Sequence, residues 1–328
     1  MNSRMAPRIS VIVPFRNARR LLPALVDALR AQTLAQSLFE VLWVDDGSSD
    51  DGCAWLRGQL SPTWRVLASG ERRGSYAARN TGLRAAGGDN VAFTDVDCRP
   101  YEDWLEQGLL ALAAAPRAAG RIELELSDSP SIAELVDAGR FLRQRHYVQE
   151  GFAATANLFV RRAVFAQVGG FIEDLRSGGD QEFGWRCSRA GIPIMYADRA
   201  AVSHAARATL RGLLQKGERV GFGGGQVLRR RGMPVSTFAR RAGERFTVAR
   251  RQDAADQSKP RLGVIRSCLV SAVHLLVLSA NVAGVLRGVL TPVAGASAPH
   301  TSDANGVTHE PSKLLAGDRN SKPVAGRS

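Results

Sequence analysis

The sequence is poor in cysteine and in aromatic side chains. Four cysteines occur among its 328 residues, and aromatic residues make up 6% of the chain. Cys53, Cys98, Cys187 and Cys268 lie far apart and form no CxxC or CxxH pair. This spacing excludes a zinc-finger type of site and a disulfide framework, and it is typical of a protein from a reducing cytosol.

Two further features are missing near the N-terminus. The first residues contain no apolar signal segment and no small-residue cleavage site, so we expect no secretory signal. The first apolar stretch, residues 9–13, is followed by Pro14-Phe-Arg-Asn17, which contains neither G-x-G-x-x-G nor a P-loop. This absence excludes a nicotinamide-dinucleotide site and a kinase-type phosphate loop. The Gly-rich residues 221–225 follow a basic helical pattern, not a strand, and we interpret them as a flexible hinge.

Positive charge is concentrated in one part of the chain. The net charge is +13, and residues 207–266 contain 15 Lys or Arg against 4 Asp or Glu, which leaves 15 − 4 = +11 there. Such a stretch suits an anionic membrane leaflet or a nucleic acid, and it can also be a solvated helical surface. Its only aromatic residues are Phe222, Phe238 and Phe246, so base stacking is weak and we expect no specific nucleic-acid partner.

Apolar runs alternate with helical patterns over the first hundred residues. Continuous apolar runs predict buried strands, and residues at spacings of three and four predict helices. The predicted strands are 9–13, 41–44, 65–68 and 90–94, and the predicted helices are 18–32, 50–60 and 76–86. This alternation predicts an α/β fold with a mostly parallel, doubly wound sheet flanked by helices.

The second hundred residues follow a looser pattern. We expect helices at 102–115, 131–146 and 180–190, an edge strand at 121–126, and strands at 157–160 and 193–197. Residues 206–266 form a basic helical region, and residues 291–328 are rich in Ala, Gly, Ser and Pro, which predicts a disordered tail.

An uncharged segment lies near the C-terminus. Residues 267–286 carry no formal charge and are flanked by Arg266 and Arg287. Because about 20 residues cross a bilayer, this apolar helix (267–290) is predicted as a membrane span, an interfacial helix or a soluble packing helix. The basic stretch before it favours the cytoplasmic face of the cell membrane, with a peripheral or single-span attachment, and otherwise the cytoplasm.

Carboxylates follow two of the predicted strands. Asp45 and Asp46 come directly after the second apolar run, and Asp95 and Asp97 come after the fourth. Carboxyl ends of parallel strands line the ligand crevice of an open sheet. These acids would repel a diphosphate unless a cation lay between them, and their oxygen ligands suit Mg²⁺ or Mn²⁺.

Four segments in this half resemble the successive donor-site signatures of family 2 glycosyltransferases. They are Ile9-Ser-Val-Ile-Val-Pro14, Val44-Asp-Asp-Gly-Ser-Ser-Asp50, Ala78-Arg-Asn-Thr-Gly82 and Thr94-Asp-Val-Asp97. The resemblance covers residues 8–205 and implies a GT-A fold over residues 1–205, with a donor half (1–100) and an acceptor half (101–205). It also implies an enzyme of cell-envelope polysaccharide or glycolipid biosynthesis with a nucleotide-sugar donor and a saccharide, lipid-linked or small-molecule acceptor.

The resemblance also implies donor-site roles. The nucleotide would be bound by Pro14, Asp45, Asp46, Arg79 and Asp95, with its nucleobase at Asp45 and Asp46. Asp97 would bind the metal ion directly, and His204 would complete the metal site.

The catalytic base is implied by Ser177-Gly-Gly-Asp-Gln-Glu-Phe-Gly-Trp-Arg186, which is similar to the family's E-D-x-E motif. Asp180 matches the base, and Glu182 is a second acidic candidate on the acceptor side. Asp180 also stands where a helix N-cap is expected. Asn157 begins a segment that borders the acceptor site in the family.

The implied reaction is a single inverting displacement, with a uridine diphosphate sugar as the commonest donor. Residues 226–230 partly resemble the Q-x-x-R-W box of processive synthases, but Arg230 replaces the Trp, which favours addition of one sugar at a time. Two alternatives remain open at this point: a sugar-phosphate nucleotidyltransferase, and a non-catalytic basic protein that binds nucleic acid or membranes.

Overall fold

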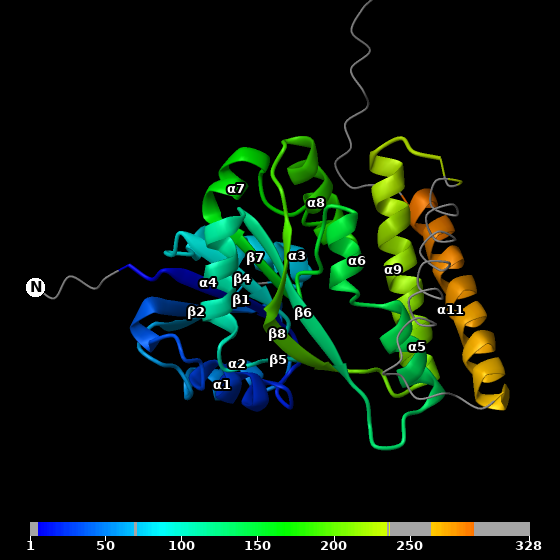
Figure 1. Cartoon of the computed structure of the whole chain (residues 1–328), viewed down its shortest axis with the longest axis horizontal. Helices are drawn as coiled ribbons and strands as arrows, with labels where there is room; N and C mark the ends of the chain where they lie inside the picture. The colour runs from blue at the N-terminus through cyan, green and yellow to red at the C-terminus, as the bar shows by residue number, and fades with distance from the viewer. Residues whose placement is uncertain (1–5, 69–70, 235, 237–263, 292–328) are drawn as a thin grey trace, which may run out of the picture. The chain divides into compact units, whose positions relative to one another are not determined.

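A computed structural model of the chain describes residues 6–68, 71–234, 236 and 264–291. Its centre is one eight-stranded sheet with the order β3-β2-β1-β4-β7-β6-β8-β5, flanked by helices (Figure 1). The strands are β1 (Ile9–Phe15), β2 (Phe39–Asp45), β3 (Trp64–Ala68), β4 (Asn90–Thr94), β5 (Cys98–Pro100), β6 (Arg117–Glu125), β7 (Asn157–Arg161) and β8 (Met195–Ala205).

The first half of the sheet is parallel. β1 pairs with β2 and β4, and β2 pairs with β3, all in parallel register. All seven residues of β1 are buried, because helices cover both faces of the sheet. The predicted α/β fold with a mostly parallel sheet is confirmed.

The second half mixes directions. β7 runs antiparallel to both β4 and β6, β6 runs parallel to β8, and β5 runs antiparallel to β8. β6 lies between β7 and β8, but β7 pairs only with Arg117–Ala119, and Arg121–Glu125 pair with β8. Within the described residues the second half of β6 therefore has one partner strand, and its residues alternate between half-buried and exposed, as the predicted edge strand at 121–126 requires.

Most of the helices lie near their predicted positions. They are α1 (Leu22–Arg30), η1 (Gln36–Leu38), α2 (Gly52–Arg57), α3 (Ser75–Ala85), α4 (Trp104–Ala114), α5 (Ile132–Arg140), α6 (Gln144–Gln149), α7 (Arg162–Val168), α8 (Gly179–Arg189), α9 (Leu210–Arg230) and α11 (Val264–Leu290). The single helix predicted at 131–146 is two helices, since Leu142 between them has a φ of 57° and cannot continue an α-helix.

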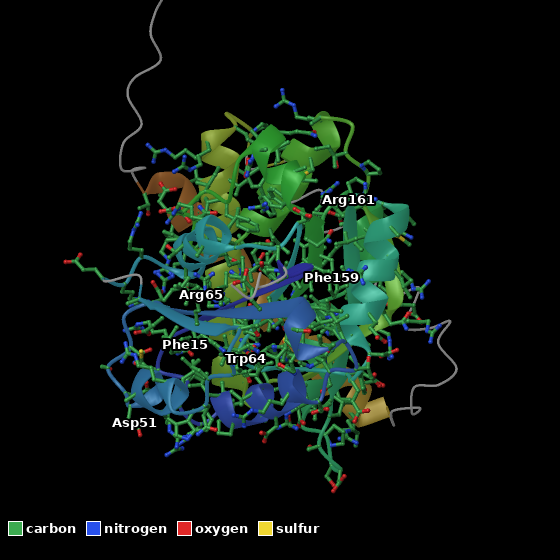
Figure 2. All side chains as sticks on the ribbon, turned by 90° about the vertical axis from the view of Figure 1, so that its left-hand side faces the viewer. Phe15, Asp51, Trp64, Arg65, Phe159 and Arg161 are labelled. Atoms are coloured by element: carbon green, nitrogen blue, oxygen red, sulfur yellow. The ribbon has the colours of Figure 1, made fainter. Side chains whose placement is uncertain are left out.

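Two apolar cores lie on the two faces of the sheet. Alternate residues of β1 separate them, with Val11 and Val13 in one cluster and Ile12 in the other. Figure 2 shows Trp64 and Phe159 inside the domain, where they are 3% and 0% exposed. The sheet is therefore a rigid platform for the loops at its carboxyl edge.

Helices α9 and α11 lie side by side and run in the same direction (Figure 1). Residues 221–225 are inside α9, so the predicted hinge was wrong. Gly221 and Gly225 face the backbone of α11 at Asn281 and Val285, and a Cβ at either glycine would overlap it. Glycine serves here for close helix packing and not for flexibility. The part of the predicted tail after Thr291 lies outside the described residues.

Candidate active site

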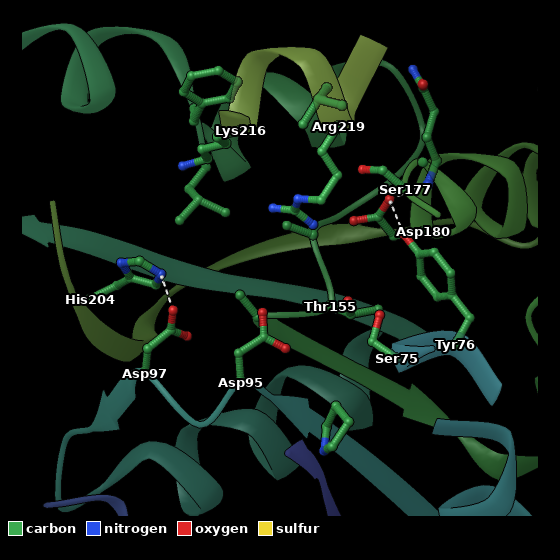
Figure 3. A pocket seen from close by; sticks show the side chains of 18 of the residues that line it. Ser75, Tyr76, Asp95, Asp97, Thr155, Ser177, Asp180, His204, Lys216 and Arg219 are labelled. Atoms are coloured by element: carbon green, nitrogen blue, oxygen red, sulfur yellow. Dashed lines mark hydrogen bonds and ion pairs between the residues drawn. The ribbon is translucent and has the colours of Figure 1, made fainter. Parts of the chain in front are cut away.

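A cavity of about 400 Å³ lies between the carboxyl edge of the sheet and the helices above it (Figure 3). One wall, here called the strand wall, carries Pro14, Asp95 and Asp97 next to His204. The opposite wall, here called the helix wall, carries Asp180 from α8 and Arg219 from α9, among other residues. Side chains from the edge of the sheet and from helices α8 and α9 therefore face the same cavity.

Asp95 on the strand wall forms an ion pair with Arg79. Arg79 comes from α3 and is 4% exposed, and its guanidinium lies 5.6 Å from the centre of the Tyr76 ring. Asp95 is less covered, since its side chain is 35% exposed. The pair places one cation and one carboxylate at the cavity surface, which suits a nucleotide's ribose and phosphate groups.

Asp97 and His204 form the second pair of this wall. His204 Nε2 lies 3.3 Å from Asp97 Oδ2, and its Nδ1 lies 2.8 Å from the carbonyl oxygen of Ala205. Burial lowers the pKa of His204, but the hydrogen bond and charge of Asp97 outweigh it and raise the pKa. Burial likewise opposes ionisation of Asp97, but His204 outweighs it and lowers that pKa.

The predicted metal ligands offer two donors. Within residues 6–68, 71–234 and 264–291, no three His, Cys, Asp or Glu side chains form a metal-binding group. One carboxylate and one imidazole fit a cation that takes its other ligands from water and from substrate phosphates, as Mg²⁺ commonly does. The pair therefore fits Mg²⁺ or Mn²⁺ in combination with a bound diphosphate.

Among the residues that the structure describes, no cation forms an ion pair with Asp180 on the helix wall. Its Oδ1 accepts a hydrogen bond from Gln181 N at 2.9 Å and lies 3.4 Å from the Tyr76 hydroxyl. Burial raises the pKa of Asp180, and the charge of Asp95 acts in the same direction. The N-cap prediction was wrong, because Gly178 is the cap, with a φ of 76°, and Asp180 lies in the first turn of α8.

Asp45 and Asp46 lie at the end of β2, outside the lining of the cavity. Asp45 Oδ1 accepts a hydrogen bond from Ser48 N, and Asp46, which is 6% exposed, accepts bonds from Arg73 N and Gly74 N. These carboxylates fix the loops that follow β2 and precede α3. The structure therefore places them beside the cavity, not in it.

Asn157 and Glu182 are not brought to the cavity either. Asn157 is fully buried, accepts a hydrogen bond from Trp104 Nε1 at 2.9 Å and donates one to the carbonyl oxygen of Ala200 at 2.9 Å. Glu182 pairs with Arg186 at 2.9 Å on its own helix. Asn157 therefore links β7 to α4 and β8, whereas Glu182 forms a contact within α8.

Sequence reasoning missed a group of cations on the helix wall. Arg176, Arg207, Lys216 and Arg219 line the cavity opposite the strand-wall carboxylates. Burial lowers the pKa of Lys216 to about 8, although its Nζ lies 2.8 Å from the buried Asp137. The sequence showed Arg207, Lys216 and Arg219 only as part of a basic stretch, because helical periodicity alone did not show which of its residues face the cavity, and it gave no signal for Arg176.

Comparisons with known proteins agree with this geometry. A sequence profile of Glycosyl transferase family 2 matches residues 10–169. The chain is 35% identical to glycosyltransferase AglE of Haloferax volcanii over 227 residues, which cover 67% of this chain and 74% of that protein. It is 32% identical to a pre-mycofactocin glycosyltransferase of Mycobacterium tuberculosis over 62% of this chain and 44% of that protein.

Among solved structures, the mannosyltransferase PcManGT of Pyrobaculum calidifontis, in complex with GDP-Man and Mn²⁺, has a similar fold. Its TM-score is 0.51 at 18% identity, over 88% of this chain and 76% of that one. This likeness supports the GT-A type of sheet, and the similarity to AglE supports the family. The chain therefore belongs to glycosyl transferase family 2 and is a glycosyltransferase.

Proposed function

We propose that this glycosyltransferase moves a sugar from a nucleotide-diphosphate donor to an acceptor hydroxyl, with inversion at the anomeric carbon. The observation that carries the proposal is the cavity itself. Asp180 lies on one wall, with no ion-paired cation in the described part of the chain, and Asp95, Asp97 and His204 lie on the other. A sugar bound between the walls would have a base on one side and its leaving group on the other.

Asp180 is the proposed catalytic base. It accepts the proton of the acceptor hydroxyl while the hydroxyl oxygen forms a bond to the anomeric carbon, and the bond from that carbon to the diphosphate oxygen breaks on the opposite face. Its raised pKa makes it a stronger base than an ordinary aspartate. The diphosphate leaves as an anion and needs no proton from a second carboxylic acid, unlike the leaving group of most glycosidases.

The strand wall is the proposed donor side. Mg²⁺ or Mn²⁺ held by Asp97 and His204 would neutralise charge on the diphosphate. The same part of the cavity is lined by Pro14, Arg79 and Asp95. Asp45 and Asp46 shape the adjoining loops, where the nucleobase of the donor would be bound. We propose a uridine diphosphate sugar as the donor.

The helix wall is the proposed acceptor side. Asn157 and Glu182 do not contact the acceptor directly: Asn157 positions β7 against α4 and β8, and Glu182 stabilises α8, which carries Asp180. Gln226 and Arg230 bond to the loop before α8, with Gln226 Oε1 3.0 Å from Arg176 N and Arg230 paired with Asp174. Arg230, which replaces the Trp of the Q-x-x-R-W box, is thus engaged with Asp174 and does not stack on a sugar ring, which favours transfer of a single sugar. The acceptor is a saccharide, a lipid-linked molecule or a small molecule of cell-envelope glycan synthesis at the cytoplasmic face.

A panel of nucleotide sugars tests the proposal. Full-length protein is incubated with UDP-, GDP- and dTDP-sugars in the presence of Mg²⁺, Mn²⁺ or EDTA, and donor hydrolysis and thermal shift are measured. We expect one UDP-sugar to be hydrolysed and to raise the melting temperature, with both effects lost in EDTA. Equal activity in EDTA would contradict the metal assignment, and a preference for GDP- or dTDP-sugars would contradict the donor assignment.

A further inference from the structure

The outward face of α11 is largely apolar, with charged residues, Arg266 and Arg287, only near its two ends. Its exposed large apolar side chains recur at helical spacing, and they are Ile265, Leu269, Leu275, Leu276, Val282, Leu286 and Leu290. The hydroxyl of Ser279, which is also exposed, donates back to the carbonyl oxygen of Leu275 at 3.0 Å. A helix on the surface of a water-soluble domain normally has the opposite arrangement, with polar residues outward.

The inward face of α11 has small residues and one buried amide. Gly284 and Gly288 face the α9 backbone at Glu218 and Phe222, and a Cβ at either glycine would overlap it. Asn281, which is 4% exposed, donates from Nδ2 to the carbonyl oxygen of Gly217 at 2.8 Å. Small residues every fourth position on both helices allow this close approach. The α9–α11 pair is thus a tightly packed unit.

Helix α9 belongs to the catalytic domain. Lys216 and Arg219 line the cavity, Glu218 pairs with Arg287 of α11, and Gly223 lies against the backbone of Ser177. Lys216, Glu218 and Arg219 lie at the level of the middle of α11, since the neighbouring Gly217 and Gly221 face Val277 and Asn281. If the packed pair crossed a bilayer, these charged side chains would enter its interior, where charged groups are strongly disfavoured.

Length and apolarity alone make Ile265–Leu290 a candidate membrane span. We propose instead that α11 is an interfacial helix, which lies in the plane of an anionic membrane surface with its apolar stripe in the headgroup boundary. Arg266 at the start of α11 and Arg229, which donates to the carbonyl oxygen of Val289 near the end of α11, supply positive charge at the two ends of this helix. Arg230 and Arg287 contribute less, because each is paired with a carboxylate. This inference concerns attachment and does not depend on the transfer reaction.

Vesicle flotation tests the apolar stripe. Full-length protein is mixed with phosphatidylcholine vesicles that contain phosphatidylglycerol, and the floated fraction is compared with that on phosphatidylcholine alone. Wild type should bind the anionic vesicles more strongly. The double variant Leu275→Gln/Leu276→Gln should bind about tenfold more weakly, because two apolar anchors that are 61% and 51% exposed are lost.

A matched variant controls for general changes in the surface. Leu60→Gln/Leu110→Gln alters two exposed leucines on other parts of the domain and should bind vesicles like wild type. Both double variants should keep the wild-type melting temperature and donor hydrolysis, which separates loss of attachment from loss of folding or catalysis. The proposal is overturned if wild-type protein does not bind the anionic vesicles, or if the Leu275/Leu276 variant binds them as well as wild type.

Two measurements distinguish the lipid surface from a true span and from a second copy of the chain. Protein expressed in cells should be released from membranes by alkaline carbonate, and resistance to release would indicate a span. The exposed Cys268 should react more slowly with a membrane-impermeant maleimide when anionic vesicles are added, while the reaction of Cys53 should not change. A dimer that protects Cys268 without vesicles, and that the Leu275/Leu276 variant dissociates, would assign the stripe to a second copy instead.

Discussion

On the strand wall of the cavity, Asp95 pairs with Arg79 and Asp97 pairs with His204, whereas on the helix wall Asp180 lies near a tyrosine hydroxyl and a backbone N–H. The difference shows in the pKa values. The pKa of Asp97 is lowered because the contribution of His204 outweighs burial, and that of Asp180 is raised, chiefly by burial. The carboxylate of Asp97 on the strand wall therefore stays ionised, whereas the carboxylate of Asp180 on the helix wall accepts a proton more readily than an ordinary aspartate.

The sharpest test of this contrast is Asp180→Asn. The amide keeps the size of the side chain but cannot accept the proton, so turnover should fall about 10²- to 10⁴-fold, while donor still binds. Transfer rate and donor-induced thermal shift are measured together. The control Glu182→Gln, which loses only the contact with Arg186, should stay within several-fold of wild type. Normal transfer by Asp180→Asn would remove the assignment of the base.

The strand wall is tested by Asp97→Ala. Loss of one of two proposed metal ligands should weaken metal-dependent donor binding by about tenfold or more, or 1.4 kcal/mol. Titration of Mn²⁺ against donor-induced thermal shift measures this effect. Asp51→Ala removes a carboxylate that is 74% exposed and does not line the cavity, and it should behave like wild type. If both variants bound metal and donor equally, Asp97 would not be a ligand.

The support behind the helix wall is tested by Gly221→Leu. A side chain there overlaps the carbonyl oxygen of Asn281, so α11 must shift, and we expect a loss of about 1–3 kcal/mol in unfolding free energy. Chemical denaturation followed by circular dichroism gives the value. Ala283→Leu introduces the same side chain on the exposed side of α11 and should cost little. A hinge at residues 221–225 would instead tolerate the leucine.

The smallest expected effect is on stability against pH. Since the folded-state pKa of Asp180 is above its unfolded value, the native state holds more protons between those two values, and stability falls as pH rises through that window. Asp180→Asn removes this loss, so it should melt slightly above wild type at neutral pH and no higher below about pH 4. Melting curves from pH 4 to 8 measure the difference. An equal gain at every pH would show that ionisation of Asp180 is not its cause.

Family membership decides between the alternatives that the sequence left open. The similarity to AglE excludes a purely non-catalytic protein and a sugar-phosphate nucleotidyltransferase as the class of this chain. It leaves the choice of sugar, nucleotide and acceptor to experiment.

The parallel half of the sheet and the placement of Asp95 and Asp97 followed from the sequence alone. Buried parallel strands are continuous apolar runs, and the residue after each run must lie at the sheet's carboxyl edge. The start of α5 was equally local, since Ser131 and Glu134 form a capping box. The split between α5 and α6 at Leu142 was not predicted, because a positive φ at a leucine has no simple sequence signal.

The sequence by itself determined most of the strands and helices and their order, but not β5 or α7. It also determined the carboxylates at the ends of the strands and the apolar character of residues 267–286. Only the tertiary structure decided that Asp46 and Asn157 bond to loops and strands outside the cavity, that Lys216 and Arg219 line it, and that the glycines of α9 pack against α11. The reason is physical. Periodicity depends on neighbours within one turn or one strand, whereas the partners of these residues lie 28 to 60 residues away along the chain.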